Sequence, residues 1–235
     1  MKWKKWIEKI RMVLYPRRCA CCSRVIPAEK ELCAFCEARL PRLPEPVCRR
    51  CGQARAECLC SRGPRPLYWD GFCAPFYYRD VAAQGIRQMK FRGRADGAVF
   101  FAGEMAQTLR RVFPKENLDA VCYVPMTKRK QRERGYNQAA LLAKHLAEEL
   151  QLPLLHSLVK TRDNRIQHKL KFPERQENVR GIYACRESLT GKRILLVDDI
   201  KTTGFTLNAC AEALKAAGAR RVVCTAAGIV LPKAL

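Results

Sequence analysis

From residue 67 onward the apolar residues of this chain alternate between two spacings. Apolar runs predict strands at 70–78, 119–124, 194–197 and 220–229, with an edge strand at 181–185. Apolar residues three and four positions apart predict helices at 81–91, 98–112, 138–150 and 206–217. Strands that alternate with helices indicate a largely parallel sheet. We therefore expect an α/β fold, a parallel sheet flanked by helices, over residues 67–235.

The first 66 residues follow a different pattern. Residues 3–14 carry apolar side chains at helical spacing with basic side chains between them, which predicts an amphipathic helix. That helix either packs on its neighbour or touches a membrane or nucleic acid. Residues 17–66 have too few apolar residues for a core of their own and need another source of stability. Residues 62–66 are typical of a linker, so we expect two domains, 1–66 and 67–235.

Metal ions bound by cysteines are the source of stability that we expect for residues 17–66. Eight of the 14 form four close pairs, and sequential pairing assigns them to two zinc ions, the first held by Cys19, Cys22, Cys33 and Cys36 and the second by Cys48, Cys51, Cys58 and Cys60. Four thiolates complete a tetrahedral structural zinc site. The last pair has a single intervening residue, Cys21 competes with Cys22, and free or redox-active thiols are the alternative.

Charge narrows the choice of partners and compartment. The chain has 45 basic and 22 acidic residues, a net charge of +23, which favours polyanions, whether nucleic acid, nucleotide phosphates or anionic lipid. No apolar run approaches the roughly 20 residues that span a bilayer, and charged residues interrupt the start, unlike a signal peptide. We expect a cytoplasmic protein with at most peripheral contact at the inner face of the membrane. A reduced compartment favours metal ligation over disulfides.

The strand at 194–197 leads directly into candidate phosphate chemistry. Asp198 and Asp199 follow it, then Lys201-Thr202-Thr203-Gly204-Phe205-Thr206, then a helix. Ligands of parallel sheets bind at the carboxyl ends of strands, and a helix N-terminus favours phosphate. Two acids suit sugar hydroxyls and Mg²⁺, while threonines and backbone amides suit phosphate. This order of residues indicates a site for a ribose 5-phosphate; a plain strand–turn–helix is the alternative.

Two further basic segments are candidates for the same site. Residues 127–134 follow the strand that ends at Pro125, and we interpret them as a basic loop. The charges that would suit a pyrophosphate group are those of Lys128, Arg129, Arg132 and Arg134. A solvated turn is the alternative. The basic segment 160–183 is long for a loop and is either a lid over the site, a surface for an acidic partner, or a solvated loop.

The stretch 194–206 resembles the phosphoribosyl-pyrophosphate (PRPP) motif of type I phosphoribosyltransferases. The resemblance implies that Asp198 and Asp199 hold the ribose 2′- and 3′-hydroxyls and that Lys201–Thr206 hold the 5′-phosphate, with Mg²⁺ accompanying PRPP. Together with the cysteine pairs, Lys90-Phe91-Arg92-Gly93, residues 132–138 and residues 178–181, the chain resembles the ComF family of competence-associated proteins. In that reading Lys90 and Arg92 are further site candidates.

The ComF resemblance implies a zinc ribbon joined to a PRPP-binding domain that acts in DNA uptake. It also implies handling of single-stranded DNA beside a DNA-translocating helicase, although related members serve another pathway. One hypothesis is a phosphoribosyltransferase with an unknown acceptor. The alternative is a non-catalytic single-stranded DNA-binding protein or helicase-docking scaffold that uses the PRPP site for regulation.

Overall fold

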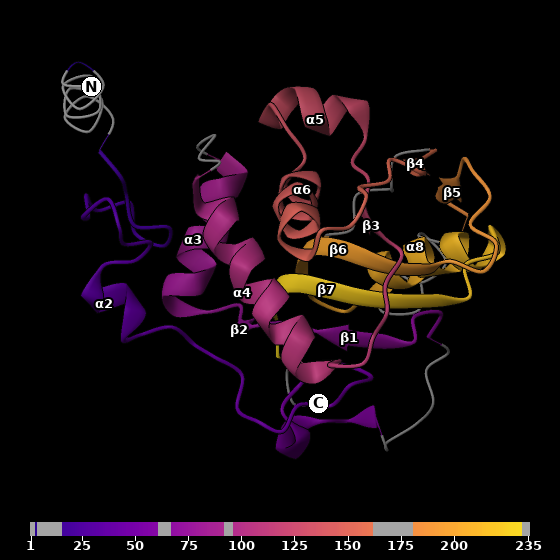
Figure 1. Ribbon diagram of the computed structural model, residues 1–235, viewed down its shortest axis with the longest axis horizontal. Helices are drawn as coiled ribbons and strands as arrows, with labels where there is room; N and C mark the ends of the chain where they lie inside the picture. The colour runs from indigo at the N-terminus through magenta and orange to yellow at the C-terminus, as the bar shows by residue number, and fades with distance from the viewer. Residues whose placement is uncertain (1–2, 4–15, 61–66, 92–95, 162–180, 232–235) are drawn as a thin grey trace, which may run out of the picture.

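A five-stranded parallel sheet forms the centre of the protein. The computed structural model describes Trp3 and residues 16–60, 67–91, 96–161 and 181–231. The strand order is β1-β7-β6-β3, and β2 also pairs with β7 (Figure 1). The strands are β1 (Gly71–Cys73), β2 (Phe76–Tyr77), β3 (Ala120–Tyr123), β6 (Arg193–Lys201) and β7 (Arg221–Ile229). Every pairing in this sheet is parallel, so the α/β prediction is confirmed.

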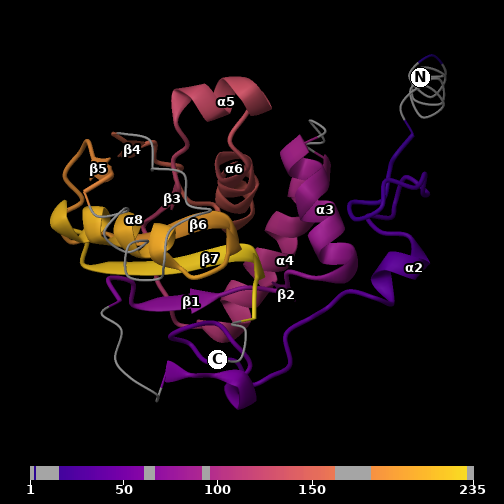
Figure 2. The ribbon, with the colours of Figure 1, turned by 180° about the vertical axis from the view of Figure 1, so that it is seen from behind.

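Helices cover both faces of the sheet. One face packs against α3 (Asp80–Phe91), α4 (Asp96–Val112) and α6 (Gln138–Leu150), and the other against α8 (Phe205–Ala216) (Figures 1 and 2). Alternate residues of a strand point to opposite faces. In β6, Leu195 and Val197 therefore join the α3–α4–α6 core, while Leu196 joins the α8 core. This two-sided burial explains why the run at 194–197 is apolar throughout.

The first predicted strand is interrupted. We expected one strand over residues 70–78, but β1 and β2 are separate strands that both pair with β7. Pro75 lies between them and has no N–H group to donate to a ladder. Its carbonyl instead accepts a hydrogen bond from the backbone N–H of Leu43 at 3.3 Å. The break thus gives the N-terminal segment a place to attach to the sheet.

The basic segment after β3 is a helix, so the predicted loop is wrong. α5 spans Lys128–Arg134. The side chain of Thr127 accepts a hydrogen bond from the backbone N–H of Lys130 at 3.5 Å, and Gly135, at φ +84°, ends the helix. Lysine, arginine, glutamine and glutamate are good helix formers. A capping threonine before the run and a glycine after it were readable in the sequence.

A second, smaller sheet lies beside the first. β4 (Leu158–Lys160) pairs antiparallel with β5 (Tyr183–Cys185), which confirms the strand expected at 181–185. β4 was not predicted, because a run of three residues is too short to show a period of two. The pairing places Lys160 directly opposite Tyr183.

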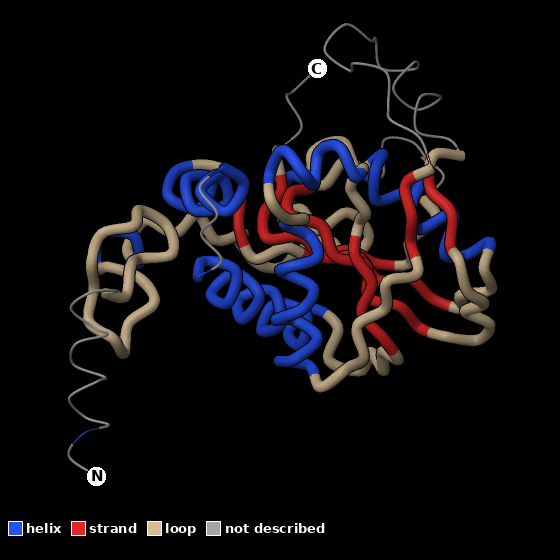
Figure 3. Tube along the Cα trace, turned by 90° about the horizontal axis from the view of Figure 1, so that it is seen from above, coloured by secondary structure: helices blue, strands red, loops and turns tan. Residues whose placement is uncertain are grey.

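The cysteine-rich segment packs against the sheet domain. It contains α2 (Ala34–Glu37) and the short 3₁₀ helix η1 (Arg55–Glu57), and Figure 3 shows the part nearest the N-terminus largely as loops. Near α3, the side-chain amide of Gln88 donates to the carbonyl of Cys21 at 3.1 Å. Near the sheet edge, the N–H of Tyr77 donates to the carbonyl of Pro41 at 2.8 Å. The expected division into domains at residues 66 and 67 stays a prediction.

Some sequence predictions fall outside the described residues. These are the helix at 3–14, apart from an exposed Trp3, the linker at 62–66 and most of the segment 160–183. Among the residues that the structure does describe, no helix has the length and apolar character needed to cross a membrane.

Candidate functional site

The acid pair opens into a pocket at the carboxyl edge of the sheet. Asp198 and Asp199 stand near the end of β6, both half-buried, and the N–H of Asp199 donates to Oδ1 of Asp198 at 2.8 Å. The pocket has a volume of about 270 Å³. Its polar lining comes from six elements and the loops beside them: Thr127, Lys130, Arg134, Asn137, Gln138, Lys160, Tyr183, Asp198, Asp199 and Thr206. The acids thus lie in a cavity rather than in packed core.

The turn after β6 leads into α8, whose second residue, Thr206, contributes to the pocket. Thr206 lines the cavity, while Thr202 and Thr203 are exposed beside it. Gly204, at φ +82°, directly precedes α8. The helix therefore begins next to the acid pair, where its first N–H groups carry partial positive charge.

Lys201 does not line the pocket, although the resemblance implied that it helps to hold the 5′-phosphate. Its side chain is 8% exposed, and its Nζ lies 5.1 Å from the centre of the Phe72 ring. The pocket lining does not include the five residues before Thr206, which are Lys201, Thr202, Thr203, Gly204 and Phe205. A contribution from these residues to a phosphate site would come from the backbone or from the rim.

One face of α5 supplies cationic groups. Lys130 and Arg134 line the pocket, whereas Lys128, Arg129 and Arg132 do not. Residues three and four positions apart share a helix face, which groups Thr127, Lys130 and Arg134. Reading the segment as a loop hid this selection: Arg134 was among the predicted residues, but Lys130 was not singled out.

Lys160 and Tyr183 add to the pocket lining from the second sheet. Nζ of Lys160 lies 5.6 Å from the centre of the Tyr183 ring. Burial raises the pKa of Tyr183 well above its ordinary value, and the neighbouring Cys210 and Asp198 act in the same direction. The hydroxyl therefore stays protonated at neutral pH and can donate a hydrogen bond. Nothing in the local sequence marked Tyr183, because only the strand pairing places it here.

Asn137 holds the back of the pocket in place. It is 8% exposed; its Oδ1 accepts from the N–H of Ala139 at 2.9 Å and caps α6, and its Nδ2 donates to the carbonyl of Val124 at 3.0 Å. One side chain thus fixes the start of α6 to the end of β3. The pocket lining combines acids from β6 with cations from α5 and β4, a combination that suits a ligand with both hydroxyl and phosphate groups.

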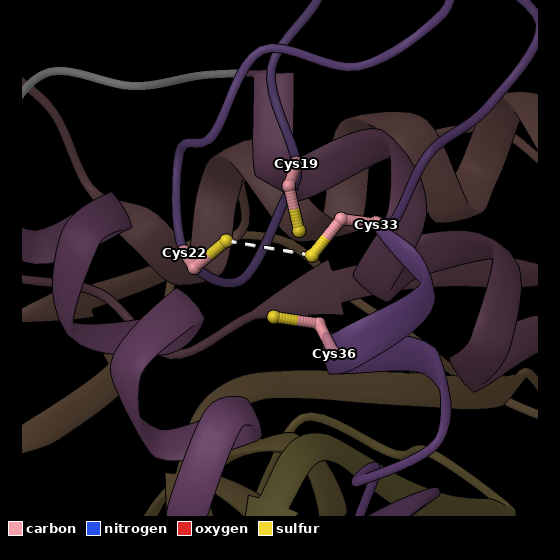
Figure 4. Close-up of side chains that lie close together, drawn as sticks. All are labelled: Cys19, Cys22, Cys33 and Cys36. Atoms are coloured by element: carbon pink, nitrogen blue, oxygen red, sulfur yellow. Dashed lines mark hydrogen bonds between the residues drawn. The ribbon is translucent and has the colours of Figure 1, made fainter.

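The first cysteine group forms a compact cluster. The ligand atoms of Cys19, Cys22, Cys33 and Cys36 all lie within 4.8 Å of one another (Figure 4). Sγ of Cys22 and Sγ of Cys33 are 3.7 Å apart. Tetrahedral ligation with Zn–S bonds of about 2.3 Å places sulfurs about 3.8 Å apart, so the group fits zinc. Burial raises the pKa of the Cys19 thiol, but backbone N–H groups around it lower that pKa to about 7, which favours the thiolate.

The second group has the same geometry despite its shorter last pair. The sulfurs of Cys48, Cys51, Cys58 and Cys60 also lie within 4.8 Å of one another, and those of Cys51 and Cys58 are 3.6 Å apart. Burial raises the pKa of the Cys48 thiol, while the N–H groups of the turn after it lower the value to about 7. Cys21 belongs to neither group; it is fully buried in the core beside α3.

Two remaining candidates lie outside what the structure describes. Nothing is described for Arg92, or for the side chain of Lys90 at the end of α3. Their place relative to the pocket stays a prediction.

Comparison with known proteins gives two matching families. A model of the phosphoribosyl transferase domain matches residues 81–228, and a model of the double zinc ribbon domain matches residues 10–74. Competence protein ComFC of Bacillus subtilis is 29% identical over 198 residues, covering 81% of this chain and 80% of that protein. DNA utilization protein YhgH of Escherichia coli K12 is 28% identical over 218 residues, with coverages of 87% and 86%. Competence protein F of Haemophilus influenzae is 26% identical over 213 residues, with coverages of 83% and 89%.

Proposed function

The chain belongs to the phosphoribosyl transferase domain family and carries a double zinc ribbon domain, and from this premise we propose that its carboxyl-edge pocket binds PRPP. The observation that carries the proposal is the meeting of Asp198, Asp199 and Thr206 with Lys130 and Arg134 around one cavity. PRPP has the groups that such a cavity would complement: ribose hydroxyls, a 5′-phosphate and a pyrophosphate.

Each group of PRPP has a proposed place. The ribose 2′- and 3′-hydroxyls donate to the carboxylates of Asp198 and Asp199. The 5′-phosphate lies at the start of α8, where Thr206 and backbone N–H groups donate to it. The pyrophosphate lies toward Lys130 and Arg134. Mg²⁺ accompanies PRPP, since this ion prefers one or two carboxylates together with substrate phosphates.

The proposed reaction is transfer of the phosphoribosyl group. An acceptor nitrogen attacks C1′ and forms a C–N bond, while the bond from C1′ to the pyrophosphate oxygen breaks and the oxygen keeps the electron pair. The acceptor nitrogen then loses a proton. Lys130 and Arg134 stabilise the charge that develops on the leaving group. Pyrophosphate release from PRPP with a panel of bases and amines tests this step; PRPP binding without release under every condition would favour the regulatory alternative.

The α5 face gives a selective test of PRPP binding. We expect Lys130→Gln and Arg134→Gln each to weaken PRPP binding roughly tenfold, because each removes a charge-assisted hydrogen bond to phosphate. The measurement is calorimetric titration of PRPP in Mg²⁺. Lys128→Gln is the matched control, since it removes the same charge from a residue of the same helix that does not line the pocket. Equal losses in all three variants would show that only net charge matters and would count against the assigned place.

The curated relatives support a role in DNA uptake. Their names place them in competence and in DNA utilization. We propose that this chain serves the same process, in the cytoplasm at the inner face of the membrane, and contacts single-stranded DNA beside a helicase partner. A net charge of +23 supports a polyanionic partner.

Single-stranded DNA binding has a measurable signature. Fluorescence anisotropy with a labelled oligothymidine should give a dissociation constant that rises at least roughly tenfold between about 50 and 200 mM salt, because binding releases condensed counterions. A protein of similar size and basic charge without a DNA role serves as the control. Salt-independent or undetectable binding would remove single-stranded DNA as a partner.

A further inference from the structure

A short segment connects the second cysteine group to the loop of the proposed phosphate site. This connecting segment, Tyr68–Phe72, leads into and includes most of β1. Trp69 is 6% exposed and Phe72 is fully buried. Both side chains therefore pack tightly, and their neighbours on either side are mechanically linked.

On one side the connecting segment holds the turn between Cys48 and Cys51. The indole N–H of Trp69 donates to the carbonyl of Arg50 at 2.9 Å, and the backbone N–H of Phe72 donates to the carbonyl of Arg49 at 2.9 Å. Gly52, at φ +78°, lies so close to Phe72 that an added Cβ would come within 2.2 Å of the ring. This turn and the connecting segment therefore pack as one unit.

On the other side the same residues support the loop before α8. A Cβ added to Gly204 would lie 2.9 Å from Cη2 of Trp69, so the indole sits directly against the loop backbone. The ammonium of Lys201 lies over the ring of Phe72. The backbone N–H of Tyr68 donates to Oδ1 of Asn208 in α8 at 2.8 Å. Three successive parts of the phosphate loop and its helix thus rest on the connecting segment.

We propose that Trp69 and Phe72 are positioning residues through which the second cysteine group sets the shape of the phosphate loop, so that zinc at this group raises PRPP affinity. A metal ion fixes the Cys48–Cys51 turn and, with it, the carbonyls of Arg49 and Arg50. Loss of the metal frees those carbonyls and removes the support beneath Gly204. The inference rests on the proposed PRPP function.

The first cysteine group does not share this connection. Its neighbours are α3 and α4: a Cβ added to Gly85 would lie 2.9 Å from the carbonyl oxygen of Ala20, and Gln88 donates to the carbonyl of Cys21. The proposal therefore predicts different effects of the two groups on the same loop, and this difference makes it testable.

Trp69→Phe tests the proposal without touching a cysteine. The variant keeps an aromatic ring but removes the N–H that donates to Arg50 and the Cη2 atom that sits against Gly204. We expect PRPP binding to weaken about fivefold, since a buried hydrogen bond and the contact with the loop are both lost, while the zinc content of the full-length protein stays unchanged. Tyr68→Phe is the matched control: it keeps the ring and the backbone N–H that donates to Asn208, and Tyr68 is 39% exposed, so affinity should stay within about twofold. Unchanged PRPP affinity in Trp69→Phe would overturn the proposal.

Paired cysteine variants give a readout that does not need PRPP. In Cys58→Ser we expect faster hydrogen exchange at the amides of residues 202–208 and weaker PRPP binding. In Cys33→Ser we expect faster exchange in α3 but wild-type exchange at 202–208. Equal effects of both variants on residues 202–208, or none from Cys58→Ser, would refute the coupling. Exchange at residues 202–208 could increase in Cys58→Ser alone while the wild type fails to bind PRPP. That result would refute the proposed function and leave the coupling standing.

Should Cys58→Ser fail to fold, Trp69→Phe provides the same comparison in the zinc-loaded protein. Exchange at residues 202–208 should then increase in Trp69→Phe relative to Tyr68→Phe, with no change in α3. Equal exchange in these two variants would contradict the proposal.

Discussion

Replacing Asp198 and Asp199 together with asparagine should abolish measurable PRPP binding, a loss of at least roughly 100-fold, and leave the protein folded. Each carboxylate is proposed to accept a hydrogen bond from a ribose hydroxyl, and bonds to a charged group contribute about 1.5–3 kcal/mol each. Asparagine keeps the size of the side chain, so the pocket should keep its shape. Calorimetric titration of PRPP with Mg²⁺ measures the loss.

The control for this variant removes a carboxylate elsewhere. Asp80→Asn changes an exposed acid that pairs with Arg79 at the start of α3. It should leave PRPP affinity within about twofold of the wild type. Circular dichroism and thermal unfolding should show the double variant as folded as this control. Wild-type PRPP affinity in the double variant would remove the ribose site from the acid pair.

Loss of the first metal site should have the largest effect on stability. We expect Cys36→Ser to lower the unfolding temperature by about 10 °C or more, because structural zinc contributes on the order of 10 kcal/mol to small zinc domains. Cys36 is fully buried and belongs to the same core cluster as residues of α3 and α4. The damage should therefore reach the sheet domain.

The measurement combines metal analysis with thermal unfolding. The wild type should contain two zinc ions per chain, and Cys36→Ser should lose one of them. Cys185→Ser is the control, because Cys185 belongs to neither four-cysteine group and is only half-buried. It should keep both ions and unfold within a few degrees of the wild type. Equal unfolding temperatures for Cys36→Ser and Cys185→Ser would argue against a structural role for the metal.

The cysteine groups lie at different places on the sheet domain, one beside α3 and one beneath β1, rather than together in a separate lobe (Figures 1 and 2). A chain segment too poor in apolar residues to fold by itself thus gains stability from zinc and from the sheet domain together.

The sequence by itself determined the chemistry of local stretches. Four cysteine pairs at short spacing defined both metal groups, since the ligands of a turn are neighbours in sequence. The apolar run 194–197 located a buried strand, and Asp198 and Asp199 located its carboxyl end because they follow it directly in sequence. Helical spacing placed α6 at Gln138–Leu150, as found.

Only the tertiary structure decided which distant residues share the pocket. The turn of α5 selects Lys130 and Arg134 over their neighbours, and the pairing of β4 with β5 brings in Lys160 and Tyr183. Trp69 reaches both the Cys48–Cys51 turn and Gly204 because β1 lies beside β7, its partner from the far end of the chain. Such proximity depends on strand order and crossovers, and no local pattern of residues encodes them.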